Sequence, residues 1–254
     1  MGTFNATMRR GNMTTSEPTA LAGRIACAAS RGGTGELVVN TATYGPNGKG
    51  ARVAFTIAAS PFGRILIAAT RTGVCWIGLC DSDARLETEL RTDLHAAAIA
   101  RDDHALAGLA QIVVDYVSGP TREIALPIDI RATPFQIAAW SELCAIPWGA
   151  TRSYGEIARR LGRPGAARAV GHANGANPLA IIIPCHRAIG ADGSMTGYRW
   201  GVEYKRRLLD HEFFSFFSVT DARDARVVGQ VLREGRYPAR IATFFHQTGS
   251  LKPL

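Results

Sequence analysis

The sequence of 254 residues lacks several features that define large classes of protein. Its five cysteines are odd in number and include no C-x-x-C pair, which argues against a disulfide framework and against a zinc finger. The six histidines form no H-x-x-x-H pattern, so no metal site is expected. No apolar run reaches the ~20 residues of a membrane span, and no secretory signal opens the chain. We therefore expect a soluble cytoplasmic protein with reduced thiols and no membrane contact.

Positive charge outweighs negative charge. The chain has 29 Lys and Arg against 21 Asp and Glu, a net charge of +8 and a pI of about 9.7. The excess is concentrated between Pro147 and Glu212, where ten Lys and Arg face five Asp and Glu. A basic balance favours a polyanionic partner such as nucleic acid, although many basic proteins bind none.

In the first half of the chain, the composition and the pattern of apolar residues change near residue 51. Residues 1–50 are rich in Gly, Thr, Ala and Asn without periodicity, which predicts a disordered leader. Three apolar runs follow at 53–57, 65–69 and 75–79, separated by turn residues, and predict an antiparallel meander. Leucines at helical spacing over 86–94, and apolar residues over 106–116, predict two helices. We expect an α+β domain over 51–130.

The second half, 131–212, is predicted to be mostly helical, with an extension of unknown role over 213–254. Thr133-Pro134 and the S-x-x-E box at Ser153–Glu156 each mark a helix start. A Gly-containing turn at 162–165 and a helix over 166–173 complete a helix-turn-helix pattern, although two packed helices without DNA would look the same. The last helix is built of small residues around Arg168, which suits close approach to a narrow groove.

The clearest chemical pattern is Pro184-Cys185-His186-Arg187, which follows the apolar segment 181–183. A cysteine beside apolar residues is usually an inert core thiol. Here a stiff Ile-Pro segment, a histidine and a cation favour a nucleophile, because the thiolate is the reactive form. Successive side chains of an extended segment diverge, so a bridging water is the expected proton path between Cys185 and His186.

The same motif is the active-site signature of the O6-alkylguanine-DNA alkyltransferases. The family's order and spacing also hold elsewhere, in Phe135-Gln136-x-x-x-Trp140, Ile146-Pro147-x-Gly149-x-Thr151-x-Ser153-Tyr154, Arg168-Ala169-Val170, Asn177-Pro178, Gly193-x-x-x-Gly197-Tyr198 and Leu208-Leu209-x-His211-Glu212. The chain resembles this family closely over 130–212. Over 53–130 it resembles the family's N-terminal domain, most of all its Ada branch.

The resemblance implies a ribonuclease-H-like α+β domain followed by a winged-helix-like domain that carries the helix-turn-helix. It implies repair by direct, irreversible transfer of an alkyl group from O6 of guanine to the protein, with O4 of thymine as a second candidate substrate. One molecule would repair one lesion. The partner would be double-stranded DNA containing O6-alkylguanine, bound through the minor groove with base flipping, by a monomer that needs no cofactor.

Four catalytic roles are implied by the resemblance. Cys185 would accept the alkyl group, and His186 would act as its base through a water. Glu212 would orient His186, and Asn177 would hold the hinge between the helix-turn-helix and the active-site segment. Without the resemblance, a solvated charge on a helix would be the preferred interpretation of Glu212.

The resemblance also implies contacts with DNA and with the flipped base. Tyr154 would press on the phosphate and protonate N3 of the leaving guanine, and Arg168 would fill the vacated stack. The other implied DNA contacts are Ala167, Ala169 and Arg187. The implied pocket residues are Tyr198, Ala188, Trp200 and Arg199, with the carbonyls of Cys185 and Ala188 receiving the guanine amino group. Trp200 replaces a glycine found in some relatives and is expected to narrow the pocket.

Two other classes of function remain open from the sequence. A non-enzymatic damage sensor of the alkyltransferase-like kind would keep the helix-turn-helix but lacks the cysteine, so Cys185 argues against it. A Cys–His thiol hydrolase would place the two residues far apart in sequence and would need an oxyanion hole.

Overall fold

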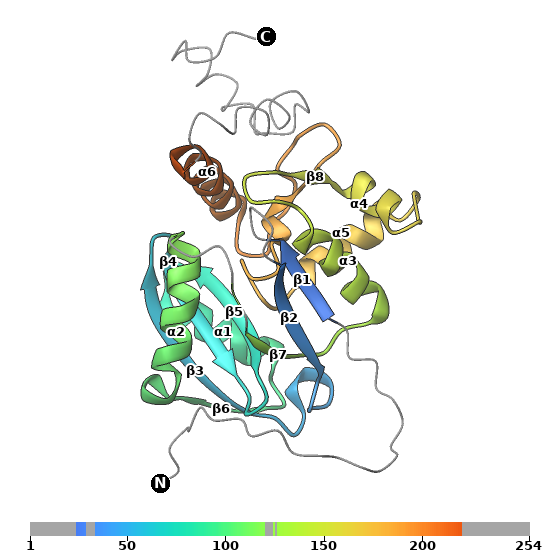
Figure 1. The fold of residues 1–254 in the computed structure, drawn as a ribbon. Coiled ribbons are helices and arrows are strands. Elements are labelled where there is room, and N and C mark those ends of the chain that lie inside the picture. Colours follow the sequence, from blue (N-terminus) through green and yellow to red (C-terminus); the bar gives the residue numbers. More distant parts are fainter. Residues whose placement is uncertain (1–23, 29–33, 120–123, 125, 220–254) are drawn as a thin grey trace.

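The computed structural model describes residues 24–28, 34–119, 124 and 126–219. A seven-stranded sheet with two helices forms one part of the molecule, and the helices that follow form the other part (Figure 1). The sheet order is β1-β2-β7-β5-β4-β3-β6. The strands are β1 (Arg24–Ala28), β2 (Thr34–Thr41), β3 (Arg52–Ser60), β4 (Gly63–Ala69), β5 (Val74–Cys80), β6 (Ala98–Arg101) and β7 (Pro127–Ile130), with a 3₁₀ turn η1 (Pro46–Gly48) before β3.

The central strands β3, β4 and β5 form the predicted antiparallel meander. The sheet as a whole is mixed, because β6 pairs in parallel with β3, and β7 pairs in parallel with β5 and β2. Parallel partners arrive through long crossovers, so local turn signals do not reveal them.

The prediction of a disordered leader over 1–50 is wrong for part of that range. Strands β1 and β2 pair with each other, and Val38–Thr41 pairs with Pro127–Ile130. The short run Leu37-Val38-Val39 carried a strand signal that the polar composition around it obscured. The rest of the leader, residues 1–23 and 29–33, lies outside the described residues.

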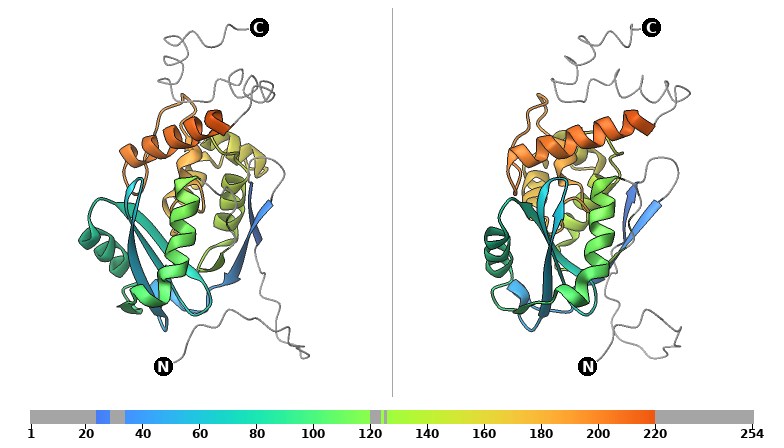
Figure 2. Two further views of the ribbon diagram at one scale, coloured as in Figure 1. Left: turned by 60° about the vertical axis from the view of Figure 1, so that its left-hand side comes forward. Right: turned by 90° about the vertical axis from the view of Figure 1, so that its left-hand side faces the viewer.

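Helices α1 (Asp83–Asp93) and α2 (Asp103–Ser118) cover opposite faces of the sheet (Figure 2). Leu86 and Leu90 of α1 belong to the core on one face, whereas Val113 and Val117 of α2 belong to the core on the other. Both helices were predicted from their apolar periodicity. The side chains of Ser82 and Asp102 cap their N-termini by accepting backbone amides.

Strand β5 is buried along its whole length and carries a bulge at its start. Ala68 and Ala69 of β4 face Trp76 and Val74, so Cys75 is the extra residue. A bulge breaks the alternation of side chains. As a result Cys75 and Trp76 both join the core beneath α1.

The helical part contains α3 (Pro134–Cys144), β8 (Arg152–Ser153), α4 (Tyr154–Arg160), α5 (Ala167–Gly175), η2 (Cys185–Arg187), β9 (Ala188–Ile189) and α6 (Val202–Val219). The predicted capping box opens α4 at Ser153, and the predicted cap at Thr133 is also a capping box, completed by Gln136 at the start of α3. Helix α6 continues past residue 212, so the predicted boundary there cuts a helix. Residues 220–254 of the predicted extension lie outside the described residues. No helix in the described part of the chain is long and apolar enough to cross a membrane.

The cysteines differ in state. Cys75, Cys80 and Cys185 are free and buried, whereas Cys144 at the end of α3 is disulfide-bonded. The expectation of reduced thiols throughout is therefore wrong at Cys144.

Candidate active site

The chain approaches Cys185 through two tight turns, whereas the apolar run 181–183 predicts a buried strand or extended segment. Each turn is closed by an N–H···O hydrogen bond of 2.7 Å between residues two apart, one centred on Ile181 and one on Pro184. Ile181 has a φ of 71°, which strains a β-branched residue by ~1–3 kcal/mol. Surrounding contacts must hold this backbone in place.

Two asparagine side chains supply part of that support. Asn177 is fully buried, and its Nδ2 donates to Sγ of Cys185 at 3.1 Å and to the carbonyl of Ile183 at 2.9 Å. Its Oδ1 accepts the amide of Leu179 at 2.9 Å. Asn174, on α5, donates to the carbonyl of Cys185 at 3.0 Å. The thiol is thus tied to the second helix of the helix-turn-helix, and Asn174 is a contact that the sequence did not predict.

Glu212 joins α6 to the active-site turn. Its Oε1 lies 2.7 Å from Nε2 of His186, and Arg187 donates to the same carboxylate from Nε at 2.9 Å and from Nη2 at 2.8 Å. The amide of Gly149 donates to Oε2 at 3.2 Å. All three charged or titratable side chains are at most 3% exposed. The predicted pairing of His186 with Glu212 is present, and a solvated position for Glu212 is excluded.

Burial keeps His186 neutral, whereas Glu212 is kept ionised by its partners. Burial raises the pKa of Glu212, but Arg187 and then His186 outweigh it and lower that pKa to about 2. Burial lowers the pKa of His186 in spite of the nearby carboxylate. Since Nε2 faces an ionised acceptor, Nε2 carries the ring proton. Nδ1, which has no hydrogen-bond partner among the described residues, is left as a proton acceptor.

Arg187, for which a DNA contact was predicted, is buried in this structure. It is 2% exposed, and besides Glu212 its Nη1 donates to the carbonyl of Ile146 at 2.7 Å. Its guanidinium also lies 5.4 Å from the ring centroid of Trp148. A buried carboxylate requires a counter-charge. Arg187 fills that requirement, so its side chain is turned inward.

Lys205 is a site residue that the sequence analysis missed. It is fully buried on α6, donates from Nζ to the carbonyl of Thr196 at 3.1 Å and lies 5.9 Å from the ring centroid of Tyr154. Burial lowers its pKa to about 8, while Cys185 acts in the opposite direction. Lys205 precedes Glu212 by seven residues, two helical turns, so both share one face of α6. This seven-residue spacing from Glu212 could have indicated Lys205 as a site residue from the sequence alone.

The Cys185 thiol is protonated at neutral pH. Burial raises its pKa to about 11, while the hydrogen bond from Asn177 and then the charge of Lys205 lower it. The hydroxyl of Tyr198 has a smaller lowering effect. Burial, followed by the proximity of Cys185, raises the pKa of Tyr198 well above its usual value. The thiol must therefore lose its proton to become a nucleophile.

A cavity of about 360 Å³ lies beside this group, between α5 and the loop before α6. Two of the predicted pocket residues, Tyr198 and Arg199, line it. Among the described residues, the lining consists of Tyr154, Gly171, Asn174, Gly175, Thr196, Gly197, Tyr198 and Arg199.

Two other predicted pocket residues do not line the cavity. Ala188 is fully buried on β9, where it pairs with Arg152. Trp200 is 2% exposed and stacks edge to face on Tyr198 at 5.3 Å between ring centroids. Trp200 packs behind the wall because bulky aromatic surface gains most from full burial. It therefore supports Tyr198 instead of narrowing the pocket.

Helix α5 presents an exposed surface of small residues next to the cavity. Arg168 and Ala169 are exposed and Ala167 is half-buried. A Cβ added to Gly171 or Gly175 would meet no atom of the described protein within 4 Å. These glycines are therefore not required by packing inside the protein, and they leave room for an external partner to approach the cavity.

Two models of one protein family match the chain. The "6-O-methylguanine DNA methyltransferase, ribonuclease-like domain" matches residues 53–130, and the "6-O-methylguanine DNA methyltransferase, DNA binding domain" matches residues 134–213. The inducible methylated-DNA–protein-cysteine methyltransferase of Bacillus subtilis is 41% identical over 147 residues, which cover 58% of this chain and 82% of that protein. The chain belongs to the 6-O-methylguanine DNA methyltransferase family.

Other members of the family are similar over comparable stretches. The transcriptional activator and DNA repair enzyme Ada of Escherichia coli is 42% identical over 165 residues, 65% of this chain. The chain spans less than half the length of that Ada protein, 47%. The crystal structure of Mycobacterium tuberculosis OGT in complex with DNA superposes with a TM-score of 0.54 at 39% identity, covering 64% of this chain and 94% of that one.

Membership of the 6-O-methylguanine DNA methyltransferase family confirms the resemblance stated from the sequence, and the two-part α+β and helical architecture confirms the predicted fold class.

Proposed function

We propose that this protein repairs DNA by transferring an alkyl group from O6 of guanine to Sγ of Cys185. The supporting observation is the position of the thiol. Cys185 is held by Asn177 and precedes a neutral His186, and Asn174, which donates to the Cys185 carbonyl, lines the cavity together with Tyr198. An sp³ alkyl carbon requires a soft nucleophile, and a thiolate in a water-poor site is one.

Proton movement follows from the charges of the site. The Cys185 thiol gives its proton, through a water, to Nδ1 of His186. Glu212 stabilises the imidazolium that forms, as a carboxylate does when it is hydrogen-bonded to the other ring nitrogen. Arg187 keeps Glu212 ionised, so the carboxylate orients the ring without taking its proton.

The transfer step then balances. The thiolate attacks the alkyl carbon, an S–C bond forms, and the C–O6 bond breaks. The electron pair leaves with guanine, whose N3 takes a proton from the hydroxyl of Tyr154, a residue that lines the cavity. The product is a neutral thioether, and no group of the described site is arranged to remove it. One molecule therefore repairs one lesion.

Access to the lesion requires the base to leave the helix. O6 of guanine lies within the base stack, so the nucleotide must rotate outward, at a cost of a few kcal/mol. Helix α5 is suited to the minor groove because it carries the small residues Ala169, Gly171 and Gly175 outside the core, and Arg168 can occupy the vacated position. The partner is double-stranded DNA, the lesion O6-alkylguanine with O4-alkylthymine as a second substrate, and the compartment the cytoplasm.

A transfer assay tests the proposal. Duplex DNA carrying O6-methylguanine, labelled in the methyl group, is mixed with the wild-type chain, with Cys185→Ser and with Cys80→Ser, which alters another free buried thiol. The label should become covalently attached to the wild type and to Cys80→Ser but not to Cys185→Ser. DNA binding without attached label would indicate a damage sensor, and label released into solution would indicate a hydrolase.

A further inference from the structure

No residue of the sheet lines the cavity, yet strand β5 contacts the active-site part of the chain directly. Strand β7 pairs with β5 only at Val74, so the rest of that edge is available. There the amide of Ile77 donates to the carbonyl of Pro178 at 2.8 Å, and the amide of Ala180 donates to the carbonyl of Ile77 at 3.0 Å. The part of β5 that β7 leaves unpaired thus holds the segment that leads to Cys185.

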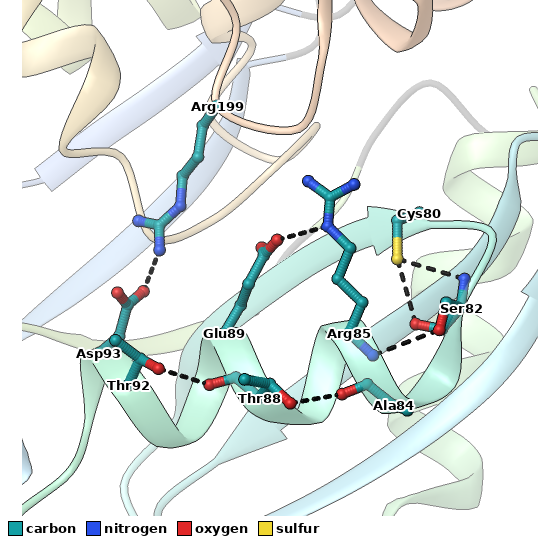
Figure 3. A network of polar contacts seen from close by, with 9 residues as sticks. All are labelled: Cys80, Ser82, Ala84, Arg85, Thr88, Glu89, Thr92, Asp93 and Arg199. Carbon is teal, nitrogen blue, oxygen red and sulfur yellow. Dashed lines mark hydrogen bonds and ion pairs between the residues drawn. The ribbon is translucent and has the colours of Figure 1, made fainter.

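A second contact reaches the wall of the cavity. Arg199, which lines the cavity, forms an ion pair with Asp93 at the end of α1 (Figure 3). The same carboxylate oxygen accepts the indole N–H of Trp76 at 2.7 Å. The guanidinium lies 6.0 Å from the ring of Trp76 and 5.6 Å from the ring of Trp200. Arg199 is therefore held by one carboxylate and two indole rings.

Nothing in α1 itself explains why residue 93, at the end of the helix, is an aspartate. The C-terminus of a helix carries partial negative charge, so a carboxylate there is unfavourable by a few tenths of a kcal/mol. Glu89, one turn earlier, is paired with Arg85 on the exposed face, as Figure 3 shows. The bulge at the start of β5 places Trp76 on the α1 side of the sheet, within reach of Asp93. Asp93 is thus positioned for contact with Arg199.

The loop that Arg199 belongs to has little backbone support. Between Thr196 and Trp200 it forms no helix or strand. The carbonyl of Thr196 accepts from Lys205, and the carbonyl of Tyr198 accepts from the amide of Gly201 at 2.9 Å. Side-chain contacts must supply the remaining support, and Tyr198, which faces the thiol, is the neighbour of Arg199.

We propose that Asp93 is a positioning residue for alkyl transfer, which acts through Arg199 to hold the cavity loop and so to place Tyr198 against Cys185. This proposal rests on the proposed transfer to Cys185. According to this proposal, the sheet and its helices do not take part in the chemistry, but they fix the width of the cavity. The ion pair between Asp93 and Arg199 is partly buried, with side chains 31% and 23% exposed, so water screens it only in part.

Asp93→Asn is the most direct test, because asparagine keeps the size and an acceptor for Trp76 but loses the charge. The single-turnover rate at saturating methylated duplex should fall by about 3- to 100-fold, since misplacement by about 1 Å costs up to about 10²-fold. Affinity for undamaged duplex should not change. Glu87→Gln is the matched control on the same helix, where Glu87 pairs with Arg91 on an exposed face. It should react like the wild type.

The double variant Asp93→Asn with Arg199→Gln should be no slower than Arg199→Gln alone, because both changes remove one interaction. Multiplied rate losses, or a wild-type rate for Asp93→Asn, would overturn the role of Asp93. If Asp93→Asn does not fold, Arg199→Gln and Arg199→Lys replace it, and lysine should restore part of the rate because it keeps the ion pair.

Amide hydrogen exchange provides a readout that does not depend on alkyl transfer. Exchange over residues 196–200 should become faster in Asp93→Asn and stay unchanged in Glu87→Gln. An active chain with unchanged exchange in Asp93→Asn would refute the positioning role alone. A wild-type chain that accepts no methyl group would instead refute the proposed function, whatever the exchange shows.

Discussion

The carboxylate of Glu212 lies 2.7 Å from Nε2 of His186 while Arg187 occupies its other face. This arrangement separates two tasks. Arg187 carries the counter-charge that a buried carboxylate needs. His186 is kept neutral mainly by its burial, so it is available as a base. The two neighbouring residues of one motif thus have complementary roles.

Replacing Glu212 by glutamine should affect both activity and stability. It leaves Arg187 buried without a counter-charge, which costs ~3–5 kcal/mol, and it removes the acceptor that orients His186. We expect a lower free energy of unfolding in urea and a transfer rate reduced by about tenfold or more, in line with the loss of general-base assistance. Glu203→Gln, an exposed change on the same helix, should alter neither quantity.

Acid stability should depend on the same carboxylate. The pKa of Glu212 falls from 4.5 to about 2 on folding, so its contribution to stability is complete above about pH 4.5 and is lost as the pH falls toward 2. Urea unfolding at several pH values should show this loss in the wild type. Glu212→Gln, already destabilised, should show a smaller decline over that window. An equal decline in both proteins would contradict the assignment.

Lys205→Met should weaken the nucleophile. Removing the buried positive charge raises the pKa of the Cys185 thiol, so the curve of transfer rate against pH should move to higher pH. At pH 7 we expect a rate about three- to tenfold lower, with little change at high pH. Arg206→Met, which removes an exposed charge one residue away, serves as the control. A uniform rate loss at every pH would indicate structural damage instead.

Arg168→Ala tests the insertion of an arginine into the DNA stack. Repair within a duplex should slow by about tenfold at saturating DNA, because base extrusion costs a few kcal/mol and nothing fills the vacancy. Reaction with free O6-benzylguanine should be almost unaffected. Arg163→Ala, a change of an exposed cation in the preceding turn, should weaken binding alone. A normal rate for Arg168→Ala at saturation would make Arg168 a phosphate contact.

Local patterns predicted the elements and motifs that depend on neighbouring residues. The capping box at Ser153, the two helices of the sheet part and the strands of the meander are of this kind. Strands β1, β2 and β6 escaped prediction because their pairing depends on distant partners. The turns at Ile181 and Pro184 escaped because three isoleucines are typical of a strand, and only the bonds from Asn177 show why the backbone bends.

The candidate site shows the same division. The motif indicated Cys185 and His186, and the family resemblance supplied Glu212 and Asn177. The sequence does not show which way a side chain points or whether it is buried. For that reason Arg187 was expected to face DNA and Trp200 to face the pocket, whereas both are buried. Lys205, Asn174 and Asp93 act through side chains that meet only in the folded chain.

The mass of the protein after reaction with excess O6-methylguanine duplex tests the central claim most directly. The account predicts one added methyl group per active molecule, about 14 Da, located by peptide mapping on Cys185, as expected for a covalent nucleophile. No further transfer should follow. Sustained turnover, or the added mass on the free thiols Cys75 or Cys80, would contradict it.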